Sequence, residues 1–234
     1  MRTFWNRAIY IIRLVVLIFF AVSITSVIIY KYCPVAYSPL MFIRCIEQMS
    51  DGEQIKLKHR WVPIDSISPH LPLAVMAGED QNFNSHNGFD FVQIKKVISE
   101  SKEGGRLRGA STISQQVAKN VFLWPSRDWV RKGLEVYFTV LIEVFWSKER
   151  IMEVYLNTIE MGDGIYGAEA VAREHFNKPA MKLTRNQCAM IAVSLPNPIK
   201  FNSSKPTKYM YKRQTWIIRQ MKNLGSWTVE TAKK

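Results

Sequence analysis

The sequence is poor in cysteine, and its three cysteines, Cys33, Cys45 and Cys188, are widely spaced and odd in number. No C-x-x-C pair occurs. We therefore expect neither a disulfide framework nor a zinc site. Zinc-finger and RNA-binding signatures are missing as well, so the sequence gives no support for a nucleic-acid partner.

Acidic residues are scarce relative to basic ones. The chain has 32 Lys and Arg against 19 Asp and Glu, a net charge of +13 over 234 residues. Residues 51–234 alone hold 27 basic and 18 acidic side chains, so most of the excess belongs to the folded part. A basic surface indicates an anionic partner, such as a membrane or a phosphate-bearing substrate.

Only one long hydrophobic run is present. Leu14 to Tyr30 is uncharged over 17 residues, and the apolar stretch begins near Ala8, interrupted by Arg13. This is close to the roughly 20 residues that one membrane-spanning helix needs. A secretory signal would have a shorter apolar core and a small-residue A-x-A cleavage site, which does not follow this run. We interpret it as an uncleaved, single-pass anchor.

The charges beside this run predict its orientation. Arg2, Arg7 and Arg13 precede or interrupt it, and only Lys31 follows closely. Because positive residues favour the cytoplasmic side, the N-terminus is expected inside and the bulk of the chain outside the cytoplasmic (inner) membrane.

Hydrophobic spacing predicts a mainly α chain in four parts: a tail and anchor (1–33), a juxtamembrane helix or linker (34–52), a globular domain (53–225) and a C-terminal tail (226–234). Helices are expected over 126–146, 148–157 and 184–195, the last two capped by Ser147 and Thr184. Further helical spacing covers 91–98, 168–176 and 210–224, whereas 54–58 alternates as a short exposed strand would.

One block of polar residues, 79–90, has the form E-D-x-x-F-x-x-H-x-G-x-D and follows the apolar run 73–77. A carboxylate at the end of an apolar segment is partly desolvated, which raises its pKa toward the range of a general base. Glu79 and Asp80 are neighbours that point roughly 100° apart on a helix. One is therefore expected to serve the reaction and the other to orient its surroundings.

His86 and Asp90, four residues apart in this block, admit two interpretations. They could form a metal pair, or they could share a structural hydrogen bond that shapes the turn around Gly88. Because no third ligand stands at metal spacing, the structural interpretation is favoured.

A second block, 108–120, carries short hydroxyls and amides that suit contacts to sugar hydroxyls or phosphates: Ser111, Thr112, Gln115 and Gln116. Lys119 lies four residues after Gln115, on the same face of a helix. Asn120 closes the block.

A cluster of charge follows at Arg131, Lys132 and Glu135, with Arg127 one helical turn earlier. On a helix, Arg131 and Lys132 flank Glu135, and such cations favour its ionised form. Glu135 is therefore better suited to hold cations around an anionic group than to donate a proton. The alternative is a surface ion-pair cluster of little energetic weight.

These blocks, in this order, resemble the glycosyltransferase domain of the peptidoglycan polymerases (glycosyltransferase family 51), which also forms the front half of class A penicillin-binding proteins. The R-K-x-x-E element at 131–135 and the K-x-x-I-x-E-x-Y-L-N element at 148–157 extend the resemblance over about residues 53–202. It implies a lysozyme-like fold. Ala110, Ser114 and Gly78 depart mildly from the family pattern and put only local backbone geometry in doubt.

The resemblance assigns roles residue by residue. Glu79 would be the general base that removes the acceptor sugar's hydroxyl proton, Glu135 would be the second catalytic carboxylate, and Lys119 would contact the donor pyrophosphate. The remaining predicted substrate contacts are Asp80, Ser111, Thr112, Gln115, Gln116, Asn120, Arg127, Arg131 and Lys132. The predicted structural residues are Phe83, His86, Gly88, Asp90, Tyr155 and Asn157.

The implied activity is that of a monofunctional enzyme without a transpeptidase domain. Ser99 to Lys102 fits the transpeptidase pattern S-x-x-K, but no K-T-G occurs, so we interpret this match as chance. It would polymerise lipid II into β-1,4 glycan strands and release undecaprenyl pyrophosphate with inversion at the anomeric carbon. Expected partners are lipid II, the growing glycan, the bilayer and proteins of cell-wall synthesis or division. No cofactor is required, although Mg²⁺ or Mn²⁺ could accompany the pyrophosphate.

Two other functions stay open on the residues. A lytic muramidase on a related fold would cut glycan, but it has no need of the cations at 119, 127, 131 and 132. A non-catalytic scaffold of cell-wall synthesis is the second, and the intact Glu79 and Glu135 argue against it.

Overall fold

The computed structural model describes residues 2–102, 109, 111–126 and 128–227. The chain divides into two compact units, residues 1–34 and residues 35–234. The first unit is helix α1 (Arg2–Tyr32), which contains an apolar stretch, Phe4–Tyr32, long enough to cross a membrane. The second unit holds all other described elements, and it is mainly α as predicted.

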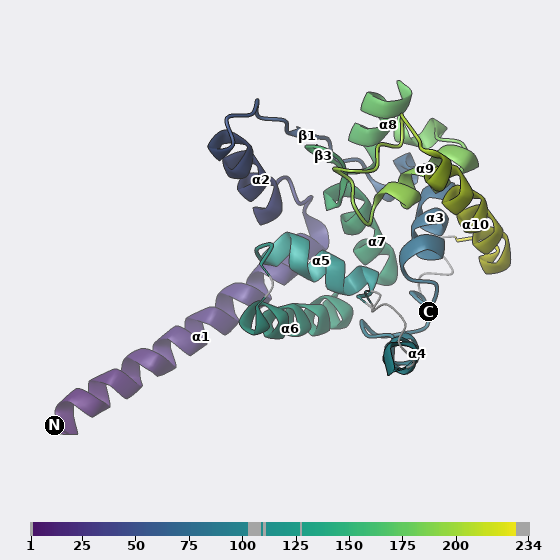
Figure 1. Ribbon diagram of the computed structural model, residues 1–234. Helices are drawn as coiled ribbons and strands as arrows, with labels where there is room; N and C mark the ends of the chain where they lie inside the picture. The colour runs from purple at the N-terminus through teal and green to yellow at the C-terminus, as the bar shows by residue number, and fades with distance from the viewer. Residues whose placement is uncertain (1, 103–108, 110, 127, 228–234) are drawn as a thin grey trace. The chain divides into compact units, whose positions relative to one another are not determined.

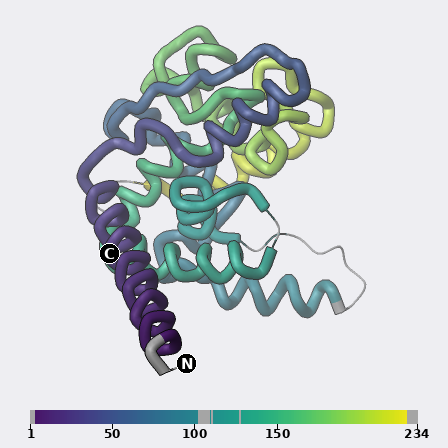
Figure 2. The backbone as a smooth tube through the Cα atoms, turned by 90° about the vertical axis from the view of Figure 1, so that its left-hand side faces the viewer, coloured from purple at the N-terminus to yellow at the C-terminus, as the bar shows by residue number. Residues whose placement is uncertain are grey.

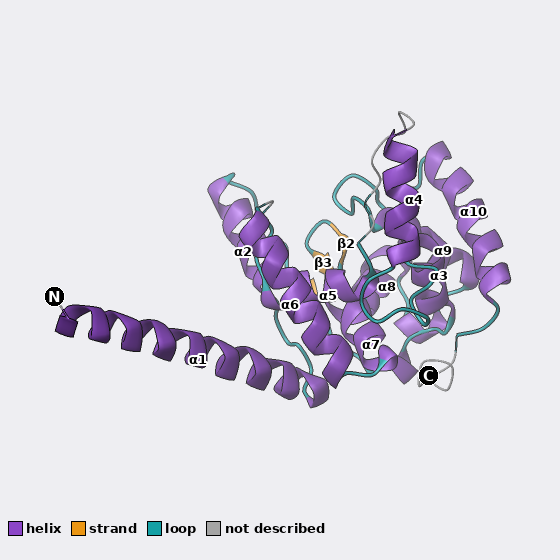
Figure 3. Cartoon of the chain, turned by 90° about the horizontal axis from the view of Figure 1, so that it is seen from below, coloured by secondary structure: helices purple, strands orange, loops and turns teal. Residues whose placement is uncertain are grey.

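The helices of the second unit form two packed groups. In the first, α3 (His70–Glu79), α9 (Arg185–Ser194) and α10 (Lys208–Leu224) pack against one another, and they lie side by side in Figures 1 and 3. In the second, α5 (Ile113–Phe122) packs on both α6 (Trp129–Phe145) and α7 (Lys148–Thr158). The remaining helices are α2 (Pro39–Ser50), α4 (Phe91–Lys102), α8 (Ala168–Phe176) and the 3-10 turns η1 (Ile64–Ser66) and η2 (Ala180–Lys182).

The helix starts follow from capping side chains. Ser147 accepts the backbone N–H of Arg150, and Thr184 accepts that of Gln187, so both predicted caps are confirmed. The predicted start of α6 directly after Pro125 is wrong. The helix begins at Trp129, because the Asp128 carboxylate accepts the N–H of Arg131 and caps the first turn.

A small sheet of order β1-β3-β2 joins distant segments of the domain. Strand β1 (Lys58–His59) runs parallel to β3 (Ile165–Tyr166), which is antiparallel to β2 (Glu160–Gly162). In Figure 2 the blue segment that contains β1 runs across the green part of the chain that contains β2 and β3. The predicted strand over 54–58 is wrong except at its last residue, because the N–H groups of Glu53 and Lys56 bond Gln48 instead of a neighbouring strand.

Helix α3 lies in the core on every side. Residues 71–77 are all buried, with an apolar side chain at each position. A helix with no polar face has to be surrounded by protein, and α9 and α10 provide that surrounding. The helix ends at Glu79, so the core fixes the position of this carboxylate.

Candidate active site

Glu79 and Asp80 diverge at the end of α3, as the sequence predicted. Asp80 is the C-cap residue, with φ −156° and ψ 81°, and its backbone leaves the helix there. Glu79 Oε2 accepts a hydrogen bond from Gln116 Nε2 at 3.0 Å. The Asp80 carboxylate instead accepts His86 Nε2 and the backbone N–H of Ile113, each at 3.0 Å. Asp80 thus orients two segments around the site, whereas Glu79 faces α5.

The environment of Glu79 suits a general base. Burial raises the pKa of the Glu79 carboxyl, and the neighbouring Asp80 raises it further. The hydrogen bond from Gln116 and the charges of Arg213 and Lys119 act in the opposite direction. The sequence prediction of a raised pKa is therefore confirmed, with desolvation as its main cause.

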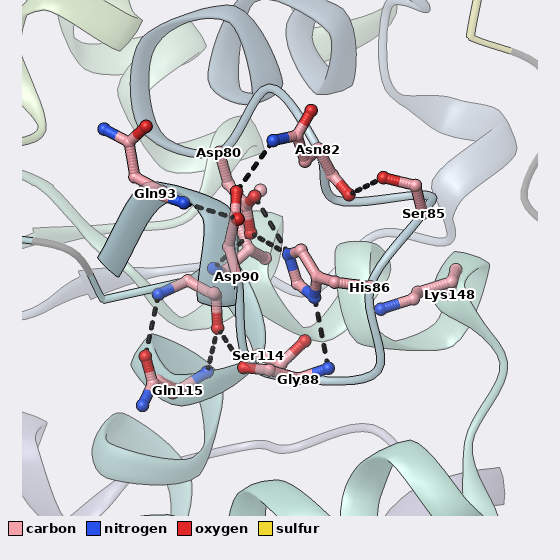
Figure 4. Close-up of polar contacts among 12 residues, drawn as sticks. Asp80, Asn82, Ser85, His86, Gly88, Asp90, Gln93, Ser114, Gln115 and Lys148 are labelled. Atoms are coloured by element: carbon pink, nitrogen blue, oxygen red, sulfur yellow. Dashed lines mark hydrogen bonds and ion pairs between the residues drawn. The ribbon is translucent and has the colours of Figure 1, made fainter. Parts of the chain in front are cut away.

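His86 is held between Asp80 and Gly88 (Figure 4). The backbone N–H of Gly88 donates to His86 Nδ1 at 3.1 Å, so Nδ1 is an acceptor and the ring proton lies on Nε2, facing Asp80. The predicted hydrogen bond between His86 and Asp90 is wrong, because His86 bonds Asp80 instead. Asp90 accepts the side chain of Asn82 and the N–H of Gln93, both at 2.8 Å. His86 does shape the turn around Gly88.

Gly88 is required for the turn. Its φ is +87°, and a Cβ there would lie 2.7 Å from Thr139 Cγ2 and 3.1 Å from Glu143 Cγ. Thr112 Oγ1 donates to the Gly88 carbonyl at 2.7 Å, which joins the loop to the start of α5. An L side chain rarely adopts such a backbone conformation, so glycine is needed on both counts.

The second block divides into capping residues and site residues. Thr112 and Gln115 form a reciprocal capping box at the start of α5, so their polar groups bond the backbone. Ser111 is exposed, Gln116 and Lys119 are partly buried, and Asn120 is buried. Of the predicted contacts in this block, Ser111, Gln116 and Lys119 are those that the fold leaves accessible to a ligand.

The charge cluster of α6 is confirmed. Arg131 Nη1 lies 2.5 Å from Glu135 Oε2, and Lys132 pairs with the other carboxylate oxygen. Arg131 and Glu135 are both buried, so their pairing offsets a large desolvation cost rather than adding surface charge. The predicted contribution of Arg127 falls outside the described residues.

Lys119 interacts electrostatically with both glutamates. Burial lowers the pKa of its ammonium group, and Arg131 and Lys132 lower it as well, whereas the charges of Glu135 and Glu79 raise it. Lys119 therefore interacts with both carboxylates, which lie 56 positions apart in the sequence. An anionic ligand at Lys119 would be within the electrostatic influence of both the α6 cations and Glu79.

The predicted structural residues hold the surrounding helices. Phe83 is fully buried, with Lys148 Nζ 4.6 Å from its ring centre. Asn157 is buried and exchanges hydrogen bonds with both backbone groups of Val62, each at 2.9 Å. Tyr155 is fully buried on α7, and its hydroxyl contacts Gln116.

Sequence reasoning missed two contributions to the site. Arg213 of α10 acts electrostatically on Glu79, but no pattern separates it from the other cations of that basic helix. Glu143 is the second, since its Oε1 accepts Lys148 Nζ at 2.8 Å and also bonds the Ser114 hydroxyl. The available sequence signal was its spacing, since Glu143 follows Glu135 and Thr139 at intervals of four residues on the same face of α6.

Metal ligands do not gather at the site. Within the ranges that the structure describes, no group of three or more His, Cys, Asp or Glu side chains could hold a metal ion. Both oxygens of Glu135 are already paired with cations.

Comparisons with known proteins agree with this geometry. The family model described as transglycosylase matches residues 46–222. A biosynthetic peptidoglycan transglycosylase of Bacteroides thetaiotaomicron is 60% identical over 209 residues, which cover 89% of this chain and 84% of the relative. The proteins of the same name from Pseudomonas entomophila and Pseudomonas fluorescens SBW25 are 51% and 50% identical, over 88% and 87% of this chain and 88% and 85% of their own lengths.

Fold and site together define a glycosyltransferase: a mainly helical, lysozyme-like domain in which a carboxylate with a raised pKa interacts electrostatically with a partly buried lysine, which also senses the α6 cations. The chain belongs to the transglycosylase family, and the resemblance found in the sequence is confirmed.

Proposed function

We propose that this protein is a monofunctional, membrane-anchored peptidoglycan glycosyltransferase that joins lipid II units into β-1,4-linked glycan strands and releases undecaprenyl pyrophosphate. The names of its relatives support peptidoglycan as the product class. The observation that carries the proposal is Lys119, a partly buried cation that interacts with both Glu79 and the Glu135 cluster. A pyrophosphate leaving group needs such cations, and an acceptor hydroxyl needs such a base.

These positions support the following reaction. Glu79 takes the proton of the acceptor sugar's 4-hydroxyl group as its oxygen attacks the anomeric carbon of the donor. The new C–O bond forms while the bond from that carbon to the pyrophosphate oxygen breaks, and the configuration inverts. The electron pair leaves with the pyrophosphate, whose charge Lys119, Arg131 and Lys132 stabilise. Glu135 keeps Arg131 and Lys132 in place by pairing with both.

The described residues contain no group of three or more His, Cys, Asp or Glu side chains that could hold a metal ion. Mg²⁺ or Mn²⁺ would be held mainly by the oxygens of the pyrophosphate itself, and Lys119 and the α6 cations would supply the positive charge from the protein.

Helix α1 would hold the site near its substrate. Its apolar stretch is long enough to span a bilayer, and Arg2, Arg7 and Arg13 near the start of the helix favour a cytoplasmic N-terminus. The catalytic domain would then lie on the outer side of the cytoplasmic membrane, where it would meet lipid II, the growing glycan and other proteins of cell-wall synthesis.

The test is incubation of the purified full-length chain with lipid II, followed by separation of the products by size. Long glycan from the wild type, and none from Glu79→Gln, supports the proposal. Cleavage of preformed glycan would identify a lytic muramidase instead. If the protein neither joins nor cuts glycan, the scaffold interpretation replaces the enzymatic one.

A further inference from the structure

Gln116 lies between Glu79 and Tyr155 and bonds both. Its Nε2 donates to Glu79 Oε2 at 3.0 Å, and its Oε1 accepts the Tyr155 hydroxyl at 3.3 Å. The three residues come from three different helices, α3, α5 and α7. The contact therefore exists only because the fold brings these helices together.

The chemistry of the two ends fixes the orientation of the Gln116 amide. A carboxylate can only accept, so Gln116 has to turn its NH₂ group toward Glu79 and its carbonyl oxygen toward Tyr155. Burial raises the pKa of the Tyr155 hydroxyl well above its usual range, and the nearby Glu79 and Asp80 act in the same direction. Tyr155 therefore keeps its proton and can donate to that carbonyl.

We propose that Tyr155 is a positioning residue for Glu79 and acts through Gln116. The Tyr155 contact is longer than the ~2.7–2.8 Å that is usual between hydroxyl donors and oxygen acceptors. It therefore contributes by orienting the amide more than by its strength. Without it, the Glu79 contact alone would hold the amide, and the Gln116 side chain would be freer to rotate away from the carboxylate.

This inference rests on the proposed function, because it takes Glu79 as the base of the reaction. The donated N–H stabilises the ionised carboxylate and so opposes the effect of burial on the Glu79 pKa. The other groups that shift the Glu79 pKa are Asp80, Lys119 and Arg213. Changes at Gln116, or at the Tyr155 hydroxyl alone, leave these three in place.

The matched variants are Tyr155→Phe, which removes one hydroxyl, and Gln116→Met, which removes both hydrogen bonds at similar length. Tyr166→Phe is the control, since Tyr166 is also fully buried but has Glu160 and Arg44 as its electrostatic neighbours. The rate of the full-length chain on lipid II is measured across a pH series. Melting temperatures show whether each variant is folded.

Loss of the orienting contact raises the Glu79 pKa, and the base has to be ionised to act. Both test variants should therefore shift the acidic limb of the pH–rate profile to higher pH. At pH values on the acidic side of the profile, the rate of Tyr155→Phe should be roughly three- to ten-fold below that of the wild type, the equivalent of one hydrogen bond. At high pH the difference in rate should be smaller. Gln116→Met should shift further, and Tyr166→Phe should match the wild type. A Tyr155→Phe profile that coincides with the wild type overturns the proposal.

A second measurement separates this inference from the proposed function. The carboxyl stretch of protonated Glu79 is assigned by infrared difference against Glu79→Gln and followed with pH, without substrate. A titration midpoint of Glu79 that rises in Tyr155→Phe and Gln116→Met supports the positioning role of Tyr155 even if lipid II is not polymerised. An unchanged midpoint in Gln116→Met refutes that role even if polymerisation is normal. The Gln116→Met result also decides the question if Tyr155→Phe does not fold.

Discussion

The Asp80 carboxylate accepts the backbone N–H of Ile113 at 3.0 Å across 33 positions of sequence. It also accepts His86 Nε2, so one buried side chain joins the end of α3, the loop after it and the start of α5. The two sequence blocks of the family are therefore one hydrogen-bonded unit. Glu79 precedes this junction and Gln116 follows it, which explains how the pair meets.

Asp80→Asn should disrupt this junction. An asparagine has one acceptor oxygen for two donors, and its NH₂ group would face a donor, so a buried donor loses its partner. The expected loss of stability is about 1–3 kcal/mol, together with a fall in activity because Glu79 is no longer positioned. Thermal melting and the lipid II assay measure the two effects. The exposed Asp65→Asn serves as control, and equal melting temperatures for both variants would contradict this role.

Glu79→Gln should abolish polymerisation and also stabilise the fold at neutral pH. General base catalysis contributes on the order of 10²–10⁴-fold. The pKa of Glu79 is higher in the folded state than in the unfolded chain. The contribution of Glu79 to the free energy of unfolding is therefore fully present at pH values below the unfolded-state pKa and is lost as the pH rises through the folded-state pKa. The neutral variant avoids that loss.

Melting curves from pH 4 to pH 8 test the sign of this effect. The advantage of Glu79→Gln over the wild type should grow with pH and vanish at the acidic end. An advantage that is constant over this range would show that the burial of Glu79 does not destabilise its charge. A variant that keeps more than about half of the wild-type rate would remove Glu79 from the role of base.

Lys119→Met is expected to weaken donor binding without unfolding the domain. The lysine is partly buried and its pKa is lowered by that burial, so a methionine of similar length removes charge at little cost in stability. Inhibition by inorganic pyrophosphate should need a higher concentration in this variant. Unchanged inhibition would show that Lys119 does not face the leaving group.

Arg131→Ala should behave differently from Lys119→Met. It leaves Glu135 buried next to Lys132 alone, and breaking a buried pair typically costs about 3–5 kcal/mol. The double variant Arg131→Met/Glu135→Met should regain most of this stability but remain inactive. Melting temperatures of the single and double variants test the idea, which is wrong if the single change leaves stability intact.

Gly88→Ala should destabilise the loop for two separable reasons. Its positive φ disfavours an L residue by roughly 1–2 kcal/mol, and its Cβ would contact Thr139 Cγ2. Thr139→Ser removes that methyl group and keeps the hydroxyl that donates to the Glu135 carbonyl. The double variant should therefore recover only part of the loss, which a comparison of unfolding free energies would show. Full recovery would mean that the backbone is not strained.

Removal of residues 1–33 should leave a folded domain that polymerises lipid II in detergent, because the compact unit 35–234 contains the whole described site. In bilayers the truncated chain should be slower, since tethering raises the local concentration of a membrane-confined substrate. Its basic surface should retain some binding to anionic liposomes, weaker at high salt. Sedimentation at two salt concentrations measures this.

The outcome at high salt identifies the binding surface. Equal binding at both concentrations would point to apolar contact, and Phe42, Ile46 and Met49 are the first candidates because they are exposed on one face of α2. If the protein stays in solution at low salt, the basic surface serves another purpose.

Local sequence patterns predict most of the helices and part of the chemistry of the site. The spacing of apolar residues placed most helices, and Ser147 and Thr184 marked the starts of α7 and α9, because capping and amphipathic patterns are local. The flanking of Glu135 by Arg131 and Lys132 followed from the helical repeat alone. The raised pKa of Glu79 followed from the apolar run before it.

The contacts between the site residues depend on the packing of the helices. His86 pairs with Asp80 and not with Asp90, Gln116 bridges Glu79 to Tyr155, and Arg213 acts on Glu79 from a helix near the end of the chain. No repeat or spacing encodes these contacts, because they depend on how α3, α5, α7 and α10 pack. Packing is set by the burial of apolar faces over the whole domain, and the polar residues meet at the points where those buried faces end.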